Sequence, residues 1–250
     1  MSERDEWHAL TAHTPARLAL GRTGNGLPTK RVLEFQLAHA RARDAVLTPF
    51  DATAVAAALN RPGTLLLATQ AAERETYLMN PDAGRRLCEA SRDALRRGRY
   101  DAVLVIADGL SSTAIHAHGA ALARLVFAAL PALDWAPVTI VSGGRVAIGD
   151  EIADALGAEL AIVLIGERPG LSAADAMGLY VTFAPKPGVT RDSERNCISN
   201  VRPGGFAPSD AAHRLAWLVD ASRRIRLTGV ALKENAPDLR GIDDAAMLGE

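Results

Sequence analysis

The sequence predicts an α/β fold, with a mainly parallel, Rossmann-like sheet flanked by helices and preceded by an N-terminal helical segment. From about residue 64 onward, short runs of leucine or β-branched residues alternate with stretches of helical periodicity. The apolar runs are continuous, as in parallel strands that are buried on both faces. Residues 1 to 60 contain helical patterns but no comparable run. The order of elements is therefore typical of helices followed by a layered α/β domain.

The composition is that of an ordinary globular protein. The chain has 250 residues, of which 48% are hydrophobic and 23% are charged. A net charge of -1 gives no overall attraction to nucleic acid or to an anionic membrane. The two cysteines, Cys88 and Cys197, belong to no metal-ligand or redox spacing, and no apolar run approaches the ~18 residues of a membrane span. We expect a soluble cytoplasmic protein without nucleic-acid or membrane partners.

The N-terminal segment predicts three helices, over residues 14–20, 29–47 and 51–60. Thr14 is the expected N-cap of the first helix, with Pro15 at its first position, and Asp51 is the expected cap of the third. The glycine-rich stretch 21–28 follows no strand. A connecting loop is therefore the better interpretation of that stretch than a phosphate-binding loop.

The remainder of the chain predicts alternating strands and helices. Strands are expected at 64–69, 101–109, 137–144, 159–166 and 178–185, and helices at 82–98, 111–130, 149–158 and 208–226. Residues 186–205 show no period. The change of pattern near residue 60 predicts an N-terminal helical segment (1–60), an α/β domain (61–232) and a polar C-terminal tail (233–250).

Three polar, glycine-containing loops follow three of the predicted strands, at residues 107–112, 142–146 and 166–170. In an open parallel sheet, ligands bind in the crevice beyond the carboxyl ends of the strands. Asp108 and Ser111 lie in the first loop, where capping of the next helix is the alternative interpretation. The coincidence of the three loops predicts a binding site at this edge.

The third loop contains Glu167 and Arg168 ahead of Pro169 and Gly170. A turn needs its proline and glycine, but nothing about turning requires an acid and a base at the mouth of a strand. One interpretation of Glu167 is a rigidly held hydrogen-bond acceptor. The other is an ion pair, solvated or formed with Arg168. The aperiodic stretch 191–205 is a further candidate for a ligand-contacting loop.

Motifs for catalysis are missing from the sequence. It contains no GxGxxG, Walker, HExxH or GxSxG pattern. His116 and His118 are two residues apart on a predicted helix and point to different faces, so no metal site is expected. Arg195 and Arg202 lie near Cys197 in the sequence and carry the charge that lowers the pKa of a thiol, but no base accompanies this residue, and a buried inert cysteine is the commoner case. A stand-alone α/β hydrolase or transferase using Ser111 or Cys197 is one hypothesis for function.

A set of motifs in fixed order supports a different hypothesis. The stretches "YLMNPDAGRRLC", "VIADGLSSTAI", "SGGRVAIGDEIADALG", "VLIGERPGL" and "RNCISNVRPGG" together resemble the small (light) subunit of ethanolamine ammonia-lyase. The resemblance extends from about residue 18 to residue 228. It implies a lyase subunit that is inactive alone and that forms a hetero-oligomer with a catalytic large subunit.

The resemblance also implies a cofactor and its contacts. The family binds adenosylcobalamin where the two chains meet, and a radical mechanism converts ethanolamine to acetaldehyde and ammonia. Matched motif by motif, the cobalamin contacts of the small chain fall on Val146, Glu167 and Cys197, and residues 61–232 become a cobalamin-binding domain. The substrate pocket lies on the large subunit, so no catalytic residue is expected here. A bacterial microcompartment is a further location that the resemblance allows.

Overall fold

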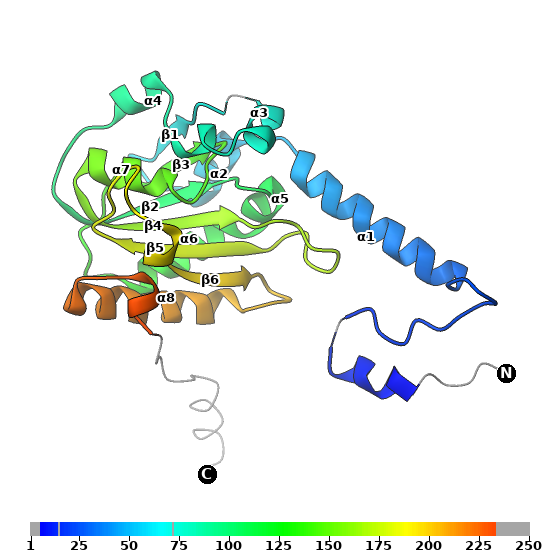
Figure 1. The fold of residues 1–250 in the computed structure, drawn as a ribbon. Helices are drawn as coiled ribbons and strands as arrows, with labels where there is room; N and C mark the ends of the chain where they lie inside the picture. The colour runs from blue at the N-terminus through cyan, green and yellow to red at the C-terminus, as the bar shows by residue number, and fades with distance from the viewer. Residues whose placement is uncertain (1–5, 15, 72, 234–250) are drawn as a thin grey trace, which may run out of the picture.

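The centre of the molecule is a six-stranded sheet (Figure 1). The computed structural model describes residues 6–14, 16–71 and 73–233. The strands lie in the order β1-β3-β2-β4-β5-β6. Their bounds are Leu65–Ala68 (β1), Tyr100–Ala107 (β2), Thr139–Ser142 (β3), Ala158–Gly166 (β4), Met177–Phe183 (β5) and Asn196–Val201 (β6). The five strands that the sequence predicts are all present, and β6 was missed.

The sheet is mixed, which corrects the expectation of a mainly parallel, Rossmann-like sheet. Strands β1, β3, β2 and β4 run parallel, whereas β5 is antiparallel to β4 and β6 is antiparallel to β5. The connection from β4 to β5 spans residues 167–176 and contains no helix. A parallel crossover needs about a dozen or more residues, usually with a helix, so this connection returns the chain as an antiparallel neighbour. The α/β class itself is confirmed.

Helices cover both faces of the sheet. Apolar residues of α2, α5, α6 and α8 share one core cluster, whereas α7 contributes to a second cluster on the opposite face. Along β2, Leu104 and Ile106 face the first cluster, and Val103 and Val105 face the second. The helix bounds are Thr29–Leu47 (α1), Ala52–Leu59 (α2), Arg74–Met79 (α3), Glu89–Ala94 (α4), Ser112–Ala114 (α5), Ala120–Ala129 (α6), Ile148–Leu156 (α7) and Pro208–Ile225 (α8).

Short helical turns complete the secondary structure of the described residues. They are Glu6–Ala12 (η1), Ala83–Arg85 (η2), Ile115–Gly119 (η3), Asp192–Glu194 (η4) and Gly229–Ala231 (η5). The η3 segment is a π-helical turn that joins α5 to α6. The predicted helix over 111–130 is therefore one element with a π-bulge, a feature often found at functional sites.

The N-terminal predictions are partly confirmed. Helix α1 matches the expected range, and the Asp51 side chain accepts a hydrogen bond from the Ala54 N–H at 2.9 Å as the N-cap of α2. The helix expected at 14–20 is wrong: residues 16–20 are not helical, and Thr14 Oγ1 accepts from the Ala16 N–H at 3.2 Å in a local turn. Pro15 lies outside the described residues.

The helix expected over residues 82–98 is also wrong, because tertiary contacts interrupt it. Leu87 is fully buried, and its N–H donates to the Glu151 carboxylate on α7 at 2.8 Å. The Cys88 N–H donates to the Ala68 carbonyl at 3.0 Å. The backbone at Cys88 therefore pairs with the end of β1 and not with a preceding turn of helix. Of the predicted helix, only the short turn η2 and the α-helix α4 are helical.

The three-part division at residues 60 and 232 stays a prediction. The side chains of Val55 and Leu59 on α2 belong to the same core cluster as β2 and β4. Apart from Lys233, the predicted tail 233–250 lies outside the described residues. Among the helices within the described ranges, none has both the length and the apolar character needed to cross a membrane.

Candidate functional site

The three polar loops meet at the carboxyl ends of β3, β2 and β4, which are neighbours in the sheet. The Asp108 carboxylate accepts hydrogen bonds from the Gly143 and Gly144 N–H groups at 2.8 and 3.2 Å. On the other side, the Leu110 N–H donates to the Gly166 carbonyl at 2.9 Å. The predicted convergence of these loops is confirmed, because neighbouring parallel strands end at the same edge.

Asp108 holds the loops together and is not open to solvent. Its exposed fraction is 5%, and its second oxygen lies 3.3 Å from Nη1 of Arg74. Burial raises the pKa of Asp108 to about 6, although Arg74 and the backbone N–H groups of Gly143 and Gly144 lower it. Asp108 thus lies at the predicted edge of the sheet, and its carboxylate forms its hydrogen bonds within the protein.

The raised pKa of Asp108 predicts a pH-dependent stability. The folded chain binds this proton more tightly than the unfolded chain does, so the contribution is fully present below about pH 4 and is lost as the pH rises through about 6. The shift corresponds to about 3 kcal/mol. In Asp108→Asn, the free energy of unfolding measured with urea is expected to lack this pH-dependent decrease between about pH 4 and 7.5. The amide oxygen still accepts from the loop N–H groups, but the amide does not titrate. If the free energy of unfolding changed with pH in the same way in the variant and the wild type, Asp108 would not be the group responsible.

Arg74, Tyr77 and Arg145 form a stack beside Asp108 that the sequence did not reveal. The two guanidinium groups lie 4.7 and 4.0 Å from the Tyr77 ring centroid. The Tyr77 hydroxyl donates to the Gly144 carbonyl at 3.3 Å, and Nη2 of Arg145 donates to the Tyr77 carbonyl at 2.7 Å. The stack fixes the 143–146 loop from α3. The one sequence signal that could have drawn attention to Tyr77 is that the chain contains only three tyrosines.

A cavity of about 310 Å³ opens next to this stack. It lies between the end of α1, helix α3 and the loops after β2 and β3. Two polar atoms among its lining residues are buried without a hydrogen-bond partner in the described part of the chain: Nη2 of Arg74 and the hydroxyl of Ser112. Buried polar groups are normally satisfied, so these atoms indicate a ligand or water with hydrogen-bonding groups.

Glu167 begins the connection after β4 and is half-buried. Its carboxylate accepts from the Asn200 N–H at 3.1 Å, and burial raises the pKa of Glu167. Arg168 is exposed, and it forms no ion pair with Glu167 or with any other residue in the described ranges. The interpretation as an ion pair with Arg168 is therefore wrong, and the Glu167 carboxylate, which accepts the Asn200 N–H, retains further acceptor capacity.

Cys197 lies on β6, directly opposite Tyr180 on β5. It is exposed, yet partial burial of its thiol raises the pKa of Cys197; Tyr180 lowers that pKa, and the Glu167 charge raises it further. Because the net direction is upward, the expectation that neighbouring arginines lower the pKa of Cys197 is wrong. The expected irregular loop around this residue is instead the antiparallel strand β6. Cys197 is therefore a protonated thiol at neutral pH.

Val146 is half-buried just before α7 and packs, together with Tyr180, against the core cluster on the α7 face. The carboxylate of Glu167 lies 3.1 Å from where a Cβ on Gly178 would stand, so a side chain at Gly178 would crowd it. Tyr180 and Gly178 lie beside these candidate residues, and the sequence did not reveal either of them. The fold therefore brings Val146, Glu167 and Cys197 to one side of the sheet.

Ser111 is not available as a nucleophile. It is fully buried, its hydroxyl donates to the Ala174 carbonyl at 2.8 Å, and the same oxygen accepts from the Ala114 N–H at 3.2 Å. The bond from the Ala114 N–H is the N-cap contact of α5, whereas the bond to Ala174 ties this cap to the connection after β4. His116 and His118 contact different partners, the Asp51 N–H and the Asp175 carboxylate. Within the described residues, no group of three or more His, Cys, Asp or Glu side chains is arranged to hold a metal ion.

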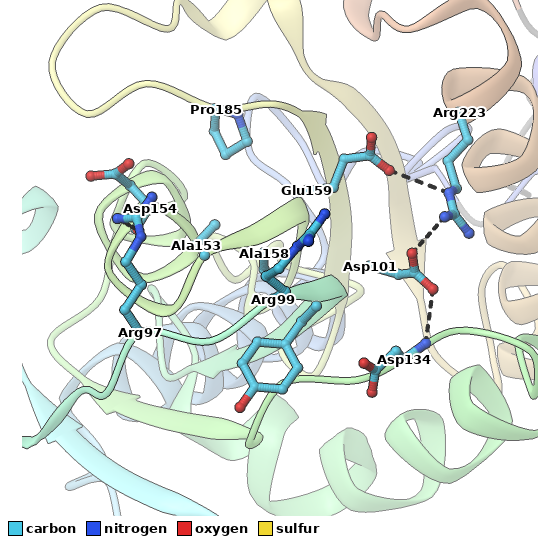
Figure 2. Close-up of a pocket in the computed structure, with 12 residues that line it drawn as sticks. Arg97, Arg99, Asp101, Asp134, Ala153, Asp154, Ala158, Glu159, Pro185 and Arg223 are labelled. Atoms are coloured by element: carbon cyan, nitrogen blue, oxygen red, sulfur yellow. Dashed lines mark hydrogen bonds and ion pairs between the residues drawn. The ribbon is translucent and has the colours of Figure 1, made fainter.

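A second cavity, of about 500 Å³, lies at the amino ends of β2 and β4 (Figure 2). Three of its charged side chains pair with one another, because Arg223 contacts both Asp101 and Glu159, and the Asp134 backbone N–H donates to Asp101. Figure 2 shows these contacts along one wall of the groove. The arrangement is a surface ion-pair network at the edge opposite the polar loops.

The fold and these contacts define a mixed α/β protein whose candidate binding site is built from the loops at the carboxyl ends of its central strands. The chain belongs to the family described as "Ethanolamine ammonia-lyase light chain (EutC)", whose model matches residues 4–233. Members of this family are subunits of a lyase. The resemblance seen in the sequence is thereby confirmed.

Curated relatives agree with the family match. The chain is 48% identical to the ethanolamine ammonia-lyase small subunit of Xanthomonas campestris pv. campestris (strain B100), over 97% of this chain and 93% of the relative. It is 49% identical to the small subunit of Pseudomonas fluorescens (strain Pf0-1), over 93% of this chain and 88% of the relative. The small subunit of Ralstonia nicotianae is also 49% identical, over 93% and 90%.

Proposed function

We propose that this chain is the cofactor-binding small subunit of an adenosylcobalamin-dependent ethanolamine ammonia-lyase that acts in the cytoplasm or in a bacterial microcompartment. It contributes cobalamin contacts at the interface with a catalytic large subunit, and the enzyme converts ethanolamine to acetaldehyde and ammonia by a radical mechanism. The observation that carries the proposal is the family match over residues 4–233, together with relatives named as small subunits.

The residues of the crevice fit such a cofactor. The corrin rim carries amide side chains that donate and accept hydrogen bonds, and the ring offers a flat apolar surface. Glu167 has acceptor capacity and no cation partner, and the cavity beside Asp108 holds two polar atoms without partners in the described part of the chain. This mixture of free acceptors and donors suits an amide-rich ligand.

Each proposed contact has a distinct role. The Glu167 carboxylate accepts from amide N–H groups, while its bond from the Asn200 N–H holds it in place. Val146 packs against an apolar surface, and Cys197 lines the pocket as a neutral thiol. Adenosylcobalamin, when bound, supplies the radical that starts the rearrangement. This chain orients the cofactor and excludes water, and it contributes no catalytic residue.

Reconstitution tests the proposal directly. The purified chain, the large subunit and the pair are each incubated with ethanolamine and adenosylcobalamin, and ammonia release is followed. We expect ammonia only from the pair, with cobalamin absorbance eluting with the complex in gel filtration. Deaminase activity from this chain alone would overturn the proposal, as would turnover of an acyl or phosphoryl substrate that Ser111→Ala abolishes.

The Glu167→Ala variant tests the site. Loss of a partly buried acceptor is expected to weaken cobalamin binding to the assembled complex by about 1 to 3 kcal/mol, or roughly five- to 150-fold in Kd. Glu159→Ala is the matched control, because Glu159 lies near the opposite end of β4 and pairs with Arg223. Equal cobalamin affinities for the two variants would exclude Glu167 as a contact.

A further inference from the structure

Residues 6–14 and 16–47, here called the N-terminal arm, extend away from the body of the molecule (Figure 1). Helix α1 is the longest element of the arm, and Ala45 is the only buried residue of this helix. Its large apolar side chains are exposed instead: Val32, Leu33, Phe35, Leu37 and Leu47. Most of the stability of a helix in a protein comes from packing an apolar face against its surroundings. Within this chain, α1 has almost no such packing.

Exposed apolar side chains are concentrated in the arm. Of the seventeen large hydrophobic residues that are exposed among the described residues, nine lie in the arm. The others are scattered over the rest of the chain. Single exposed apolar residues are normal, whereas a concentration of them marks an interaction surface.

The apolar side chains of α1 are distributed around the helix. At roughly 100° per residue, Phe35 lies about 160° around the axis from Leu37. A helix that pairs with a second copy of itself carries its apolar residues in one narrow stripe. A helix that is apolar on several sides is instead enclosed by its surroundings. This distribution favours a larger partner that wraps the arm over a second copy of this chain.

Two parts of the arm lie next to loops of the candidate site. At its root, the Val46 carbonyl accepts from Nε of Arg74 at 2.6 Å, and Leu47 lines the cavity beside Asp108. Nearer the N-terminus, residues 16–20 line a cavity of about 370 Å³ together with Leu171, from the connection that begins with Glu167. The arm and the loops of the candidate site therefore line shared cavities, so one partner can contact both.

We propose that the N-terminal arm is a principal docking surface for the large subunit, which encloses α1 in an apolar groove. This inference rests on the proposed function, which supplies the large subunit as partner and places the cofactor between the two chains. Helix α1 carries Lys30, Arg31, Arg41 and Arg43 against two carboxylates, so the groove has acidic groups at its rim.

The test uses Leu33→Glu with Leu37→Glu, two exposed sites where a charge leaves the free chain folded. Binding of the full-length chain to the large subunit is measured by isothermal titration calorimetry, with circular dichroism as the check of folding. We expect the Kd to rise at least about tenfold. Val230→Glu, at an exposed apolar residue outside the arm, is the matched control and is expected to bind as the wild type does. Leu33→Ser with Leu37→Ser serves if the charged pair fails to fold, and it is expected to weaken binding in the same direction.

The possible outcomes separate this inference from the proposed function. If the wild-type complex forms and deaminates ethanolamine with cobalamin, but the arm variants bind equally well, the arm proposal alone is overturned. If the variants change only self-association of this chain, a second copy is the occupant and the proposal is again overturned. If the wild-type chain does not bind the large subunit at all, both proposals fail.

Discussion

Replacement of Arg195 by alanine is expected to lower the free energy of unfolding by about 3 to 5 kcal/mol. The Arg195 guanidinium forms two hydrogen bonds to the Asp150 carboxylate, at 2.6 and 2.7 Å, and a third to the Thr182 hydroxyl at 3.0 Å. The side chains of Arg195 and Asp150 are only 3% and 2% exposed. The variant would leave a buried carboxylate without its cation, and such an orphaned charge costs more than the pair contributes.

Arg223→Ala is the matched control for this measurement. Arg223 also contacts two carboxylates, but its side chain is 37% exposed, so its removal is expected to cost less than about 1 kcal/mol. Urea unfolding of both variants gives the comparison. The double variant Arg195→Met with Asp150→Leu should recover much of the lost stability, because neither charge is then left unpaired. Equal losses for Arg195→Ala and Arg223→Ala would show that water reaches the Asp150 pair.

The buried pair also bears on the candidate site. Asp150 lies in the first turn of α7, four residues after Val146, and Arg195 lies two residues before Cys197. The ion pair therefore ties the helix that follows one proposed cobalamin contact to the strand that carries another. In Arg195→Ala, cobalamin affinity of the assembled complex is expected to fall together with stability.

The second large effect is expected for Gly166→Ala, with a loss of about 3 kcal/mol or more. A Cβ at this position would lie 2.2 Å from the Ser111 carbonyl oxygen and 2.4 Å from that of Asp108. Both contacts are with backbone, which cannot rotate away as a side chain can. The first and third loops of the crevice would have to separate.

Gly170→Ala, in the same connection, is the control, because the nearest atoms to its added Cβ lie 3.8 Å away. Thermal unfolding compares the two variants, and cobalamin titration of the assembled complex reports on the loops. A Gly166→Ala chain as stable as Gly170→Ala would contradict the close packing of the loops. Loss of cobalamin affinity in Gly166→Ala alone would support a binding role for this edge of the sheet.

Predictions from the sequence succeeded where a signal is local. Continuous apolar runs predicted the five strands β1 to β5, and periodicity with caps predicted α1, α2, α7 and α8. The meeting of the three polar loops was also predictable, since it follows from where parallel strands end. The family match confirms the resemblance that the ordered motifs carried.

Predictions failed where a distant contact decides the structure. Residues 82–98 have a helical pattern, yet burial of Leu87 against α7 and pairing of Cys88 with β1 interrupt it. The strand β6 carries polar residues, which its edge position tolerates and which hide it from a search for apolar runs. The direction of β5 depends on a connection too short for a crossover helix.

The sequence by itself determined the α/β class, most of the elements, the edge of the sheet where the polar loops gather and the family. Only the tertiary structure decided that Asp108 is used within the protein, that Glu167 is free of Arg168, and that Tyr180 stands opposite Cys197. The physical reason is that local propensity depends on neighbours in sequence. Burial, hydrogen-bond partners and pKa depend on neighbours in space, which strand order and direction bring together.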